Sequence, residues 1–288
     1  MNIYPSCVPC LLNRILYETN LIDPSKALEV LNEVCRIISK YDLKESCSAV
    51  VATEVHDATY DILGTRDPYK AIKDRCNQTA VSLLPKAQEV INNSKDRFKA
   101  AVLCSIIGNV LDFGISSSPE SPEKLTEQFD TLLAEGLNKD ETDKVREYLE
   151  KGGKVLYFAD NCGEIVFDKL LCQEIKKFDV HLTFVVRGQP ILTDATLEDA
   201  QEFEIGDVTD KILTTGCYAV GVNFEDMGED LKKALENVDL IISKGMGNYE
   251  TFSETDYRPI AYLLRTKCEP VAKDMNLPMN ISAVKVYE

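Results

Sequence analysis

The chain has 288 residues, of which 44% are hydrophobic, and 48 acidic against 32 basic residues give it a net charge of −16. This length and apolar content provide an ample core for one large domain or two, which excludes an intrinsically disordered chain. An acidic chain repels nucleic-acid phosphates, and no apolar run approaches the roughly 18 residues that cross a bilayer. We therefore expect neither nucleic acid nor a membrane as a partner.

The first residues and the cysteines indicate a cytoplasmic protein. The segment Met1–Cys7 lacks the basic, apolar and small-residue order of a signal peptide. The ten cysteines of a long chain of this kind do not form a disulfide framework. Most of them, including Cys35, Cys104 and Cys172, have apolar neighbours and are expected to be buried.

Residues 1 to about 150 predict a series of helices. The first begins near Cys10, and Asp23-Pro24-Ser25 is typical of the N-cap and first turn of a second. The expected ranges after the first helix are Asp23 to about Tyr41, Ser46–Leu63, Thr65–Leu84 with a continuation to Asn93, Phe98–Val110, and one or two helices within Leu125–Leu149. The apolar run from Phe98 predicts a buried central helix. Asn109 and Asp112 follow it and need polar partners or a ligand, with C-capping as the alternative.

Cys7 and Cys10 form a Cys-Val-Pro-Cys pair close to the first helix. Half of a soft-metal site, a redox pair and a plain helix start all remain open. The two histidines, His56 and His181, stand in no metal-like spacing, which disfavours a four-ligand zinc site. At a helix start the dipole can lower the pKa of a thiol, and we expect a structural or at most regulatory role for the pair.

From Gly152 onward, strands and helices alternate. Strands are expected at Val155–Phe158, Leu182–Val186, Lys211–Thr214, Leu240–Ser243, Ala261–Arg265 and Ser282–Val286, and helices at Ile165–Lys177, Thr196–Phe203, Glu225–Asn237 and Pro270–Met275. Such alternation predicts a largely parallel sheet with helices on both faces. We therefore expect a helical domain over residues 1–150 and an α/β domain over residues 151–288.

A carboxylate, an amide and a glycine stand between the first expected strand and its helix, in Asp160-Asn161-Cys162-Gly163-Glu164. In open α/β sheets, ligands bind beyond the carboxyl ends of the strands. The oxygens of Asp160 and Asn161 suit a hard cation such as Mg²⁺ or Mn²⁺ better than zinc. The alternative is a simple strand-to-helix turn, because Asn, Asp and Gly are turn formers.

Two further strand ends carry polar clusters. The second strand ends in Arg187-Gly188, and Asp194 follows at a loop-to-helix junction, either as an N-cap or as a metal ligand. The strand before Lys244 runs into Lys244-Gly245-Met246-Gly247-Asn248. The glycines let the backbone approach a ligand closely and Lys244 adds a cation, which predicts a phosphate cradle different from a P-loop.

Three common site types do not match these residues. The Gly-x-Gly-x-x-Gly of dinucleotide-binding folds is absent after the first strand, which disfavours NAD. The Gly-x-Ser-x-Gly elbow of serine hydrolases is also absent. Cys162 occupies the position where an aspartyl-phosphate phosphatase of the haloacid-dehalogenase type has its second aspartate.

The motifs resemble those of a known family. Asp160-Asn161-x-Gly163-Glu164, Gly188-Gln-Pro-Ile-Leu-Thr-Asp194-Ala-Thr and Lys244-Gly-x-Gly-Asn248, in this order, resemble the damage-control phosphatases with an ARMT-like metal-binding domain. Cys7-x-x-Cys10-Leu-Leu, Asp67-Pro-Tyr69 and Gly108-Asn109-x-x-Asp112 are similar to its archaeal and bacterial, CxxC-containing subfamily. The resemblance covers nearly the whole chain.

This resemblance implies a helical N-terminal domain on a three-layer α/β/α Rossmann-like domain with a mostly parallel sheet. It also implies a phosphatase for small phosphometabolites that depends on Mn²⁺, Ni²⁺, Co²⁺ or Mg²⁺. By the family pattern Asp160, Asn161 and Asp194 match the metal ligands, and Lys244 and Asn248 match the phosphate side. The expected substrate-binding residues are Asn109, Asp112, Gly163, Glu164, Arg187, Gly245 and Asn248. The Arg-Asp-Lys substrate segment of eukaryotic relatives is not evident, so the substrate stays open.

The predicted function is hydrolysis of a small sugar phosphate, nucleotide or related ester. The metal would polarise a phosphoryl oxygen and orient water, or activate Asp160 as a nucleophile, while Lys244 stabilises charge on the phosphoryl oxygens. Two alternatives remain. One is a carboxyl methyltransferase that uses S-adenosylmethionine, and the other is a non-catalytic metal-binding protein built around Cys7 and Cys10.

Overall fold

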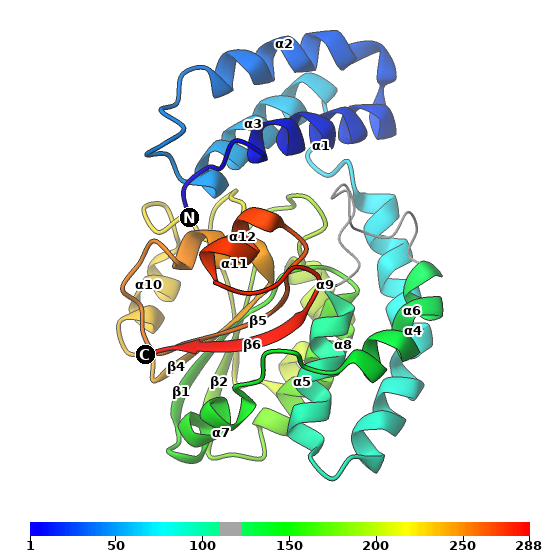
Figure 1. Cartoon of the computed structure of the whole chain (residues 1–288), viewed down its shortest axis with the longest axis vertical. Coiled ribbons are helices and arrows are strands. Elements are labelled where there is room, and N and C mark those ends of the chain that lie inside the picture. Colours follow the sequence, from blue (N-terminus) through cyan, green and yellow to red (C-terminus); the bar gives the residue numbers. More distant parts are fainter. Residues whose placement is uncertain (110–122) are drawn as a thin grey trace.

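The computed structural model describes residues 1–109 and 123–288. Within these ranges the chain is a mixed α/β protein with one six-stranded sheet (Figure 1). The strands are β1 (Gly153–Phe158), β2 (Val180–Val186), β3 (Lys211–Thr214), β4 (Leu240–Lys244), β5 (Ile260–Arg265) and β6 (Ser282–Tyr287). Their order is β3-β2-β1-β4-β5-β6, and all neighbours are parallel except β5 and β6.

Twelve α-helices lie in the described ranges. They are α1 (Cys7–Ile22), α2 (Ala27–Ile38), α3 (Ser48–Leu63), α4 (Lys70–Asn93), α5 (Arg97–Gly108), α6 (Glu123–Glu135), α7 (Thr142–Glu150), α8 (Glu164–Ile175), α9 (Leu197–Glu202), α10 (Glu229–Leu235), α11 (Gly245–Phe252) and α12 (Glu269–Asp274). None of them combines the length and the apolar content needed to cross a membrane.

Helices cover both faces of the sheet because successive side chains of each buried strand point to opposite faces. On one face, Val155 and Tyr157 of β1 belong to a core that also contains α4, α5 and α8. On the other face, Leu156 and Phe158 pack with α10, α11 and α12. The predicted largely parallel sheet between two helical layers is therefore confirmed (Figure 1).

The strand order reverses between β1 and β4, which lie side by side at the centre of the sheet. From β1 the chain proceeds outward to β2 and β3, and from β4 it proceeds in the other direction to β5 and β6. At such a switch point, the loops that follow the two central strands diverge and leave room for a ligand. Candidate site residues follow both of these strands.

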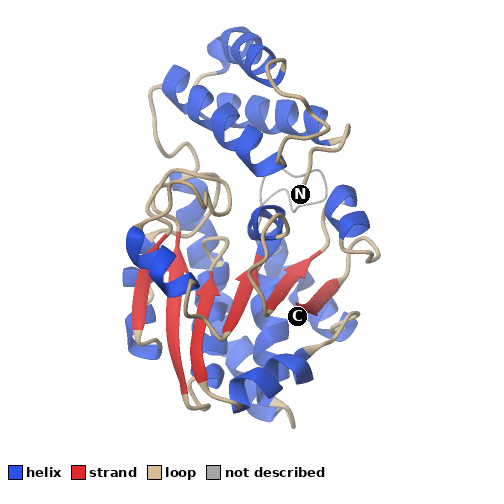
Figure 2. Ribbon diagram, turned by 90° about the vertical axis from the view of Figure 1, so that its left-hand side faces the viewer, coloured by secondary structure: helices blue, strands red, loops and turns tan. Residues whose placement is uncertain are grey.

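The helices before the sheet pack in two groups. Helices α1, α2 and α3 share a small core of their own, and Figure 2 shows them above the ends of the strands. Helices α4 and α5 instead belong to the same core as the sheet. Gly108 of α5 approaches α8 so closely that a Cβ there would lie 2.7 Å from the ring of Phe167. The domain boundary near residue 150 stays a prediction.

Some local expectations differ from the structure. The segment after β4, for which no helix was predicted, is the helix α11. Residues 70–93 form one helix through Pro85, which has no N–H to donate to the carbonyl of Val81, four residues earlier. Cys104 and Cys172 are buried as expected, but Cys35 is exposed. It lies on the outer face of α2, whose inner face carries Val30, Val34, Ile37 and Ile38.

Candidate active site

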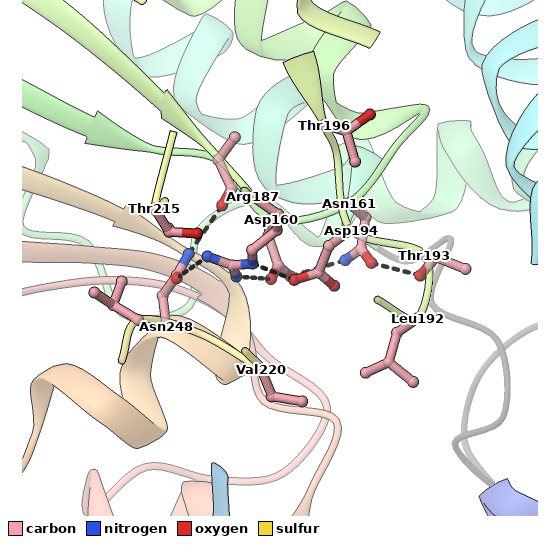
Figure 3. Close-up of polar contacts among 12 residues, drawn as sticks. Asp160, Asn161, Arg187, Leu192, Thr193, Asp194, Thr196, Thr215, Val220 and Asn248 are labelled. Carbon is pink, nitrogen blue, oxygen red and sulfur yellow. Dashed lines mark hydrogen bonds and ion pairs between the residues drawn. The ribbon is translucent and has the colours of Figure 1, made fainter. Parts of the chain in front are cut away.

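Asp160 and Asn161 follow β1 at the switch point, and the structure joins them to Asp194 from the loop after β2. Asn161 and Asp194 form an isolated antiparallel bridge, and the backbone N–H of Ala195 donates to the carbonyl of Asp160 at 2.7 Å. The hydroxyl of Thr193 donates to Oδ1 of Asn161 at 2.6 Å. The three predicted metal ligands therefore lie on two backbone segments that are hydrogen-bonded to each other (Figure 3).

The loop that carries Asp194 is fixed from both ends. At its start, the backbone N–H of Arg187 donates to the carbonyl of Ala195 at 3.0 Å. At its tip, the backbone N–H of Leu192 donates to the hydroxyl of Tyr60 in α3 at 3.2 Å. Leu192 has a φ of 50°, a left-handed conformation that costs a branched residue energy and is found where the surroundings impose it. Helix α3 thus helps to place this loop.

Arg187 connects the two carboxylates of the site. Its Nε donates to Oδ2 of Asp194, and its Nη1 donates to Oδ1 of Asn248 at 2.8 Å. Nη2 lies 3.6 Å from Oδ1 of Asp160 and has no hydrogen-bond partner among the described residues. The side chain is only 2% exposed, so this guanidinium is a preorganised cation between Asp160, Asp194 and Asn248 (Figure 3).

Asn109 reaches the site from the end of α5. Its amide nitrogen donates to Oδ2 of Asp160 and to Oε2 of Glu164, both at 2.8 Å. Its Oδ1 is buried and has no hydrogen-bond partner in the part of the chain that the structure describes. The ammonium of Lys267, which the sequence reading did not single out, donates to the carbonyl of Asn109 at 2.6 Å. Asp112, expected beside Asn109, lies outside the described residues.

Glu164 is the first residue of α8 and is completely buried. Its Oε2 accepts the backbone N–H of Asn161 at 3.1 Å as well as the amide of Asn109. Burial raises the pKa of Glu164 above its ordinary value, and the nearby ammonium of Lys244 opposes this shift. Gly163, also expected to bind substrate, donates its backbone N–H to Oδ1 of Asn77 at 2.6 Å.

The start of α11 touches Asp160 directly. Gly245 has a φ of 73°, and a Cβ at this position would lie 1.8 Å from Oδ2 of Asp160. Only glycine fits here, because the carboxylate occupies the space of a side chain. Asn248 donates its amide nitrogen to the carbonyls of Lys244 at 2.7 Å and Ala159 at 3.0 Å. These bonds fix α11 against the end of β1.

Lys244 is placed differently from the prediction. Its side chain is 0% exposed, and its ammonium contacts Glu164, Asp168 at 2.8 Å and Ser105 rather than the open edge of the sheet. Burial alone would lower the pKa of Lys244, but the carboxylates of Asp168 and Glu164 raise it above its ordinary value. The ammonium has three protons, and these internal acceptors take them all. This geometry speaks against a direct contact with a phosphoryl group.

The sequence pattern could have predicted that the side chain of Lys244 points into the core. Lys244 is the last residue of β4, so the two-residue period puts it on the same face as Leu240 and Ile242, which pack towards α5 and α8. Asp168, which the sequence reading missed, lies four residues after Glu164 in α8 and therefore on the same helix face.

The donors around Asp160 fit a hard divalent cation. Asp160 and Asp194 supply carboxylate oxygens at 6% exposure each, and Asn161 supplies an amide oxygen on the same pair of backbone segments. Oδ1 of Asn109, which has no hydrogen-bond partner within residues 1–109 and 123–288, belongs to a side chain that is hydrogen-bonded to Asp160, and it adds a further oxygen beside this set. Oxygen donors of this kind are preferred by Mg²⁺ and Mn²⁺.

The Cys7 and Cys10 pair lies in the first turn of α1. Cys10 is exposed and Cys7 is partly buried. Burial raises the pKa of the Cys7 thiol, which is opposite to the effect expected from the helix dipole. Burial also raises the pKa of Cys268, next to α12, to about 12.

The fold and the site together define an α/β protein with an oxygen-lined polar site at the switch point of a mostly parallel sheet. The chain belongs to the damage-control phosphatase ARMT1-like domain family, whose profile matches residues 3–280.

Individual relatives agree with this assignment over nearly all of their length. A damage-control phosphatase from Archaeoglobus fulgidus is 40% identical over 290 residues, which covers 100% of both chains. A second damage-control phosphatase, from Pyrococcus horikoshii, is 28% identical over 284 residues and 96% of each chain. The crystal structure of a DUF89 family protein from Pyrococcus horikoshii has a TM-score of 0.89 to this chain, at 27% identity and full coverage of both.

Proposed function

We propose that this protein is a metal-dependent phosphatase that hydrolyses small phosphorylated metabolites, with a role in metabolite damage control. The observation that carries the proposal is the convergence of Asp160, Asn161 and Asp194 at the switch point, with Arg187 between the two carboxylates. Membership of the family and the two relatives named as damage-control phosphatases support it.

In this proposal Asp160, Asn161 and Asp194 hold the divalent cation. Mn²⁺, Ni²⁺, Co²⁺ and Mg²⁺ are the candidates, and the bound ion would supply Lewis-acid polarisation of a phosphoryl oxygen. The amide of Asn109 and the backbone N–H of Ala195 keep the Asp160 segment in register with the loop of Asp194. Asn161 is oriented by Thr193 on one side and by Glu164 on the other.

Arg187 and the start of α11 bind the phosphoryl group. Nη2 of Arg187 has no acceptor among the described residues, so it can donate to a phosphoryl oxygen. The backbone N–H groups at the start of α11, from Gly245 to Gly247, are not all used inside the helix and form its positive end. Fixed donors of this type stabilise the charge that develops in the transition state.

Asp160 lies next to the reacting phosphorus in this arrangement. Its Oδ2 is held by the amides of Asn109 and Asn161, and Oδ1 faces Arg187. Two routes are open to it. Water attacks phosphorus while a carboxylate takes its proton, or Asp160 attacks first and the acyl phosphate is then hydrolysed. In both routes the phosphorus–oxygen bond of the ester breaks and inorganic phosphate and the alcohol are the products. The alcohol takes its proton from the protonated carboxyl group in the first route, and from solvent in the second, where hydrolysis of the acyl phosphate returns a proton to solvent.

The remaining parts of the proposal concern architecture and location. We assign the chemistry to a Rossmann-like domain at residues 151–288 and the cover of the site to a helical domain at residues 1–150, from which Asn109 reaches Asp160. The pair Cys7 and Cys10 supports membership of the CxxC-containing subfamily. None of the ten cysteines, all of which lie within the described residues, forms a disulfide bond, which suits the reducing cytoplasm.

A screen of small phosphate esters with Mn²⁺, Ni²⁺, Co²⁺ and Mg²⁺ tests the proposal. Release of inorganic phosphate that a chelator abolishes is the expected result. Methyl transfer from S-adenosylmethionine to carboxylates, without phosphate release, would instead favour the methyltransferase. Absence of both activities in the folded protein would favour the non-catalytic alternative.

A further inference from the structure

A cluster of buried charged groups lies beneath the site, on the α5 and α8 side of the sheet. It consists of the ammonium of Lys244 and the carboxylates of Glu164 and Asp168, all 0% exposed. Oδ1 of Asp168 accepts three hydrogen bonds, from Ser105 at 2.6 Å, Tyr157 at 2.7 Å and Lys244 at 2.8 Å. The cluster thus joins the end of β4 to β1, α5 and α8.

The stability of the fold does not account for this cluster. Moving charges out of water is costly, and apolar side chains of similar volume usually serve a core as well or better. The two carboxylates also exceed the single ammonium by one charge, and Oδ2 of Asp168 has no hydrogen-bond partner among the described residues. Because the cluster has this desolvation cost, we look for a role that depends on the positions of its charged and hydrogen-bonding atoms.

The hydrogen bonds lead from the cluster to the oxygens of the site. Lys244 bonds to Oε1 of Glu164, and Oε2 of the same carboxylate accepts the amide of Asn109 at 2.8 Å and the backbone N–H of Asn161 at 3.1 Å. The same amide nitrogen of Asn109 donates to Oδ2 of Asp160 at 2.8 Å. Glu164 therefore holds Asn161 directly and Asp160 through Asn109, which are two of the three expected metal ligands.

We propose that Asp168, acting with Lys244, is a positioning residue for the metal site. Asp168 fixes the ammonium, the ammonium fixes one oxygen of Glu164, and the other oxygen sets the positions of Asn109 and Asn161. This inference rests on the proposed function, because it assigns Asp168 to the support of the metal ligands. It also gives Lys244 an indirect role in place of a contact with the phosphoryl group.

The test is a titration of the protein with Mn²⁺ alone. Binding is measured by calorimetry or by the EPR signal of the free ion. Asp168→Asn keeps the shape of the side chain and removes its charge. Loss of a partner that orients metal ligands typically weakens metal affinity by about 10–100-fold, and this is the expected change. Tyr157→Phe is a milder second variant that keeps the stacking on Phe184 and removes one hydrogen bond to Asp168.

Glu174→Gln is the matched control. Glu174 is a buried carboxylate of the same helix, paired with Arg97 at 3.0 Å, and it lies about 15 Å along α8 from Glu164. A purely structural role predicts lower melting temperatures for Asp168→Asn and Glu174→Gln alike, with Mn²⁺ affinity unchanged in both. The positioning role predicts weaker Mn²⁺ binding in Asp168→Asn and Tyr157→Phe, and unchanged binding in Glu174→Gln.

The two proposals fail in different ways. Tight Mn²⁺ binding by the wild type together with equally tight binding by folded Asp168→Asn overturns the positioning role alone. If Asp168→Asn does not fold, equal binding by Tyr157→Phe and the wild type has the same meaning. A folded wild type that binds no Mn²⁺ overturns the metal site, and the positioning role with it.

Discussion

Substitution of Gly245 by alanine introduces a methyl group into the space of the Asp160 carboxylate. The new Cβ would lie 1.8 Å from Oδ2 and 2.2 Å from Cγ of Asp160. Non-bonded heavy atoms keep about 3.5 Å apart, so the carboxylate or the start of α11 must move by more than about 1 Å. Misplacement of about 1 Å in a catalytic site can lower the rate about 10²-fold. This loss corresponds to about 2.7 kcal/mol of activation free energy.

Alanine variants at two other glycines are the controls, because they distinguish the clash with Asp160 from other effects of a glycine-to-alanine substitution. Gly247→Ala lies in the same motif, but its Cβ would make ordinary contacts, at 3.6 Å to Val220 and 3.9 Å to Asp160. Gly64→Ala has the same φ of 73°, with no atom of the described residues within 4 Å of its Cβ. It therefore measures the cost of the left-handed backbone alone, which is about 1–2 kcal/mol of folding stability.

The assay is the steady-state rate of metal-dependent phosphate release, together with the melting temperature of each variant. We expect kcat to fall about 10²-fold in Gly245→Ala. Gly64→Ala should lose stability but not activity, and Gly247→Ala should lose little of either. Near-normal kcat in a folded Gly245→Ala protein would refute the argument that Asp160 must stay where the structure places it.

Three further predictions concern other groups. Asp160→Asn should abolish chelator-sensitive phosphate release while circular dichroism shows an intact fold, and unchanged release would remove Asp160 from the site. The double variant Cys7→Ser and Cys10→Ser should retain most of the activity, whereas its loss without unfolding would place the pair in the active site. Hydrogen bonds from the Thr196 hydroxyl and the backbone lower the pKa of Glu198 below its ordinary value of 4.5. The resulting stability is present above that value and is lost as the pH falls through the folded pKa, so Glu198→Gln should flatten the acid side of a melting-temperature curve.

The strands of the sheet could be predicted well because buried parallel strands consist of short apolar runs. Val155–Phe158 lies within β1, and the expected Leu240–Ser243 lacks only the last residue of β4. Since the carboxyl ends of parallel strands meet at one edge, the sequence also indicated that Asp160, Asn161 and Asp194 would lie together. Their backbone bridge agrees with that expectation.

Helix α11 could not be predicted from local preference. Its first three residues, Gly245-Met246-Gly247, contain two poor helix formers, and glycine usually favours a loop. The helix forms because Tyr249 and Phe252 are buried on the sheet, where Tyr249 packs on Tyr262 with ring centroids 4.9 Å apart. Tertiary packing therefore outweighs propensity in this segment.

The buried charges of Lys244 and Asp168 show that a local sequence motif alone does not predict where a side chain lies. Lys244 stands beside two glycines, a context that suggests an open ligand edge, yet β4 continues to Lys244 and turns it towards α5 and α8. Its partner Asp168 lies 76 positions earlier in the chain. A contact between residues so far apart in sequence depends on how β4 and α8 pack, and the pattern of a single segment does not contain it.

The central claim is that Asp160, Asn161 and Asp194 together form a divalent metal site. Crystals grown with Mn²⁺ and measured at the manganese absorption edge test it most directly. We expect one anomalous peak with side-chain oxygens of these three residues at roughly 2.0–2.6 Å. A peak at another place, or none at a Mn²⁺ concentration that saturates phosphatase activity, would contradict the account.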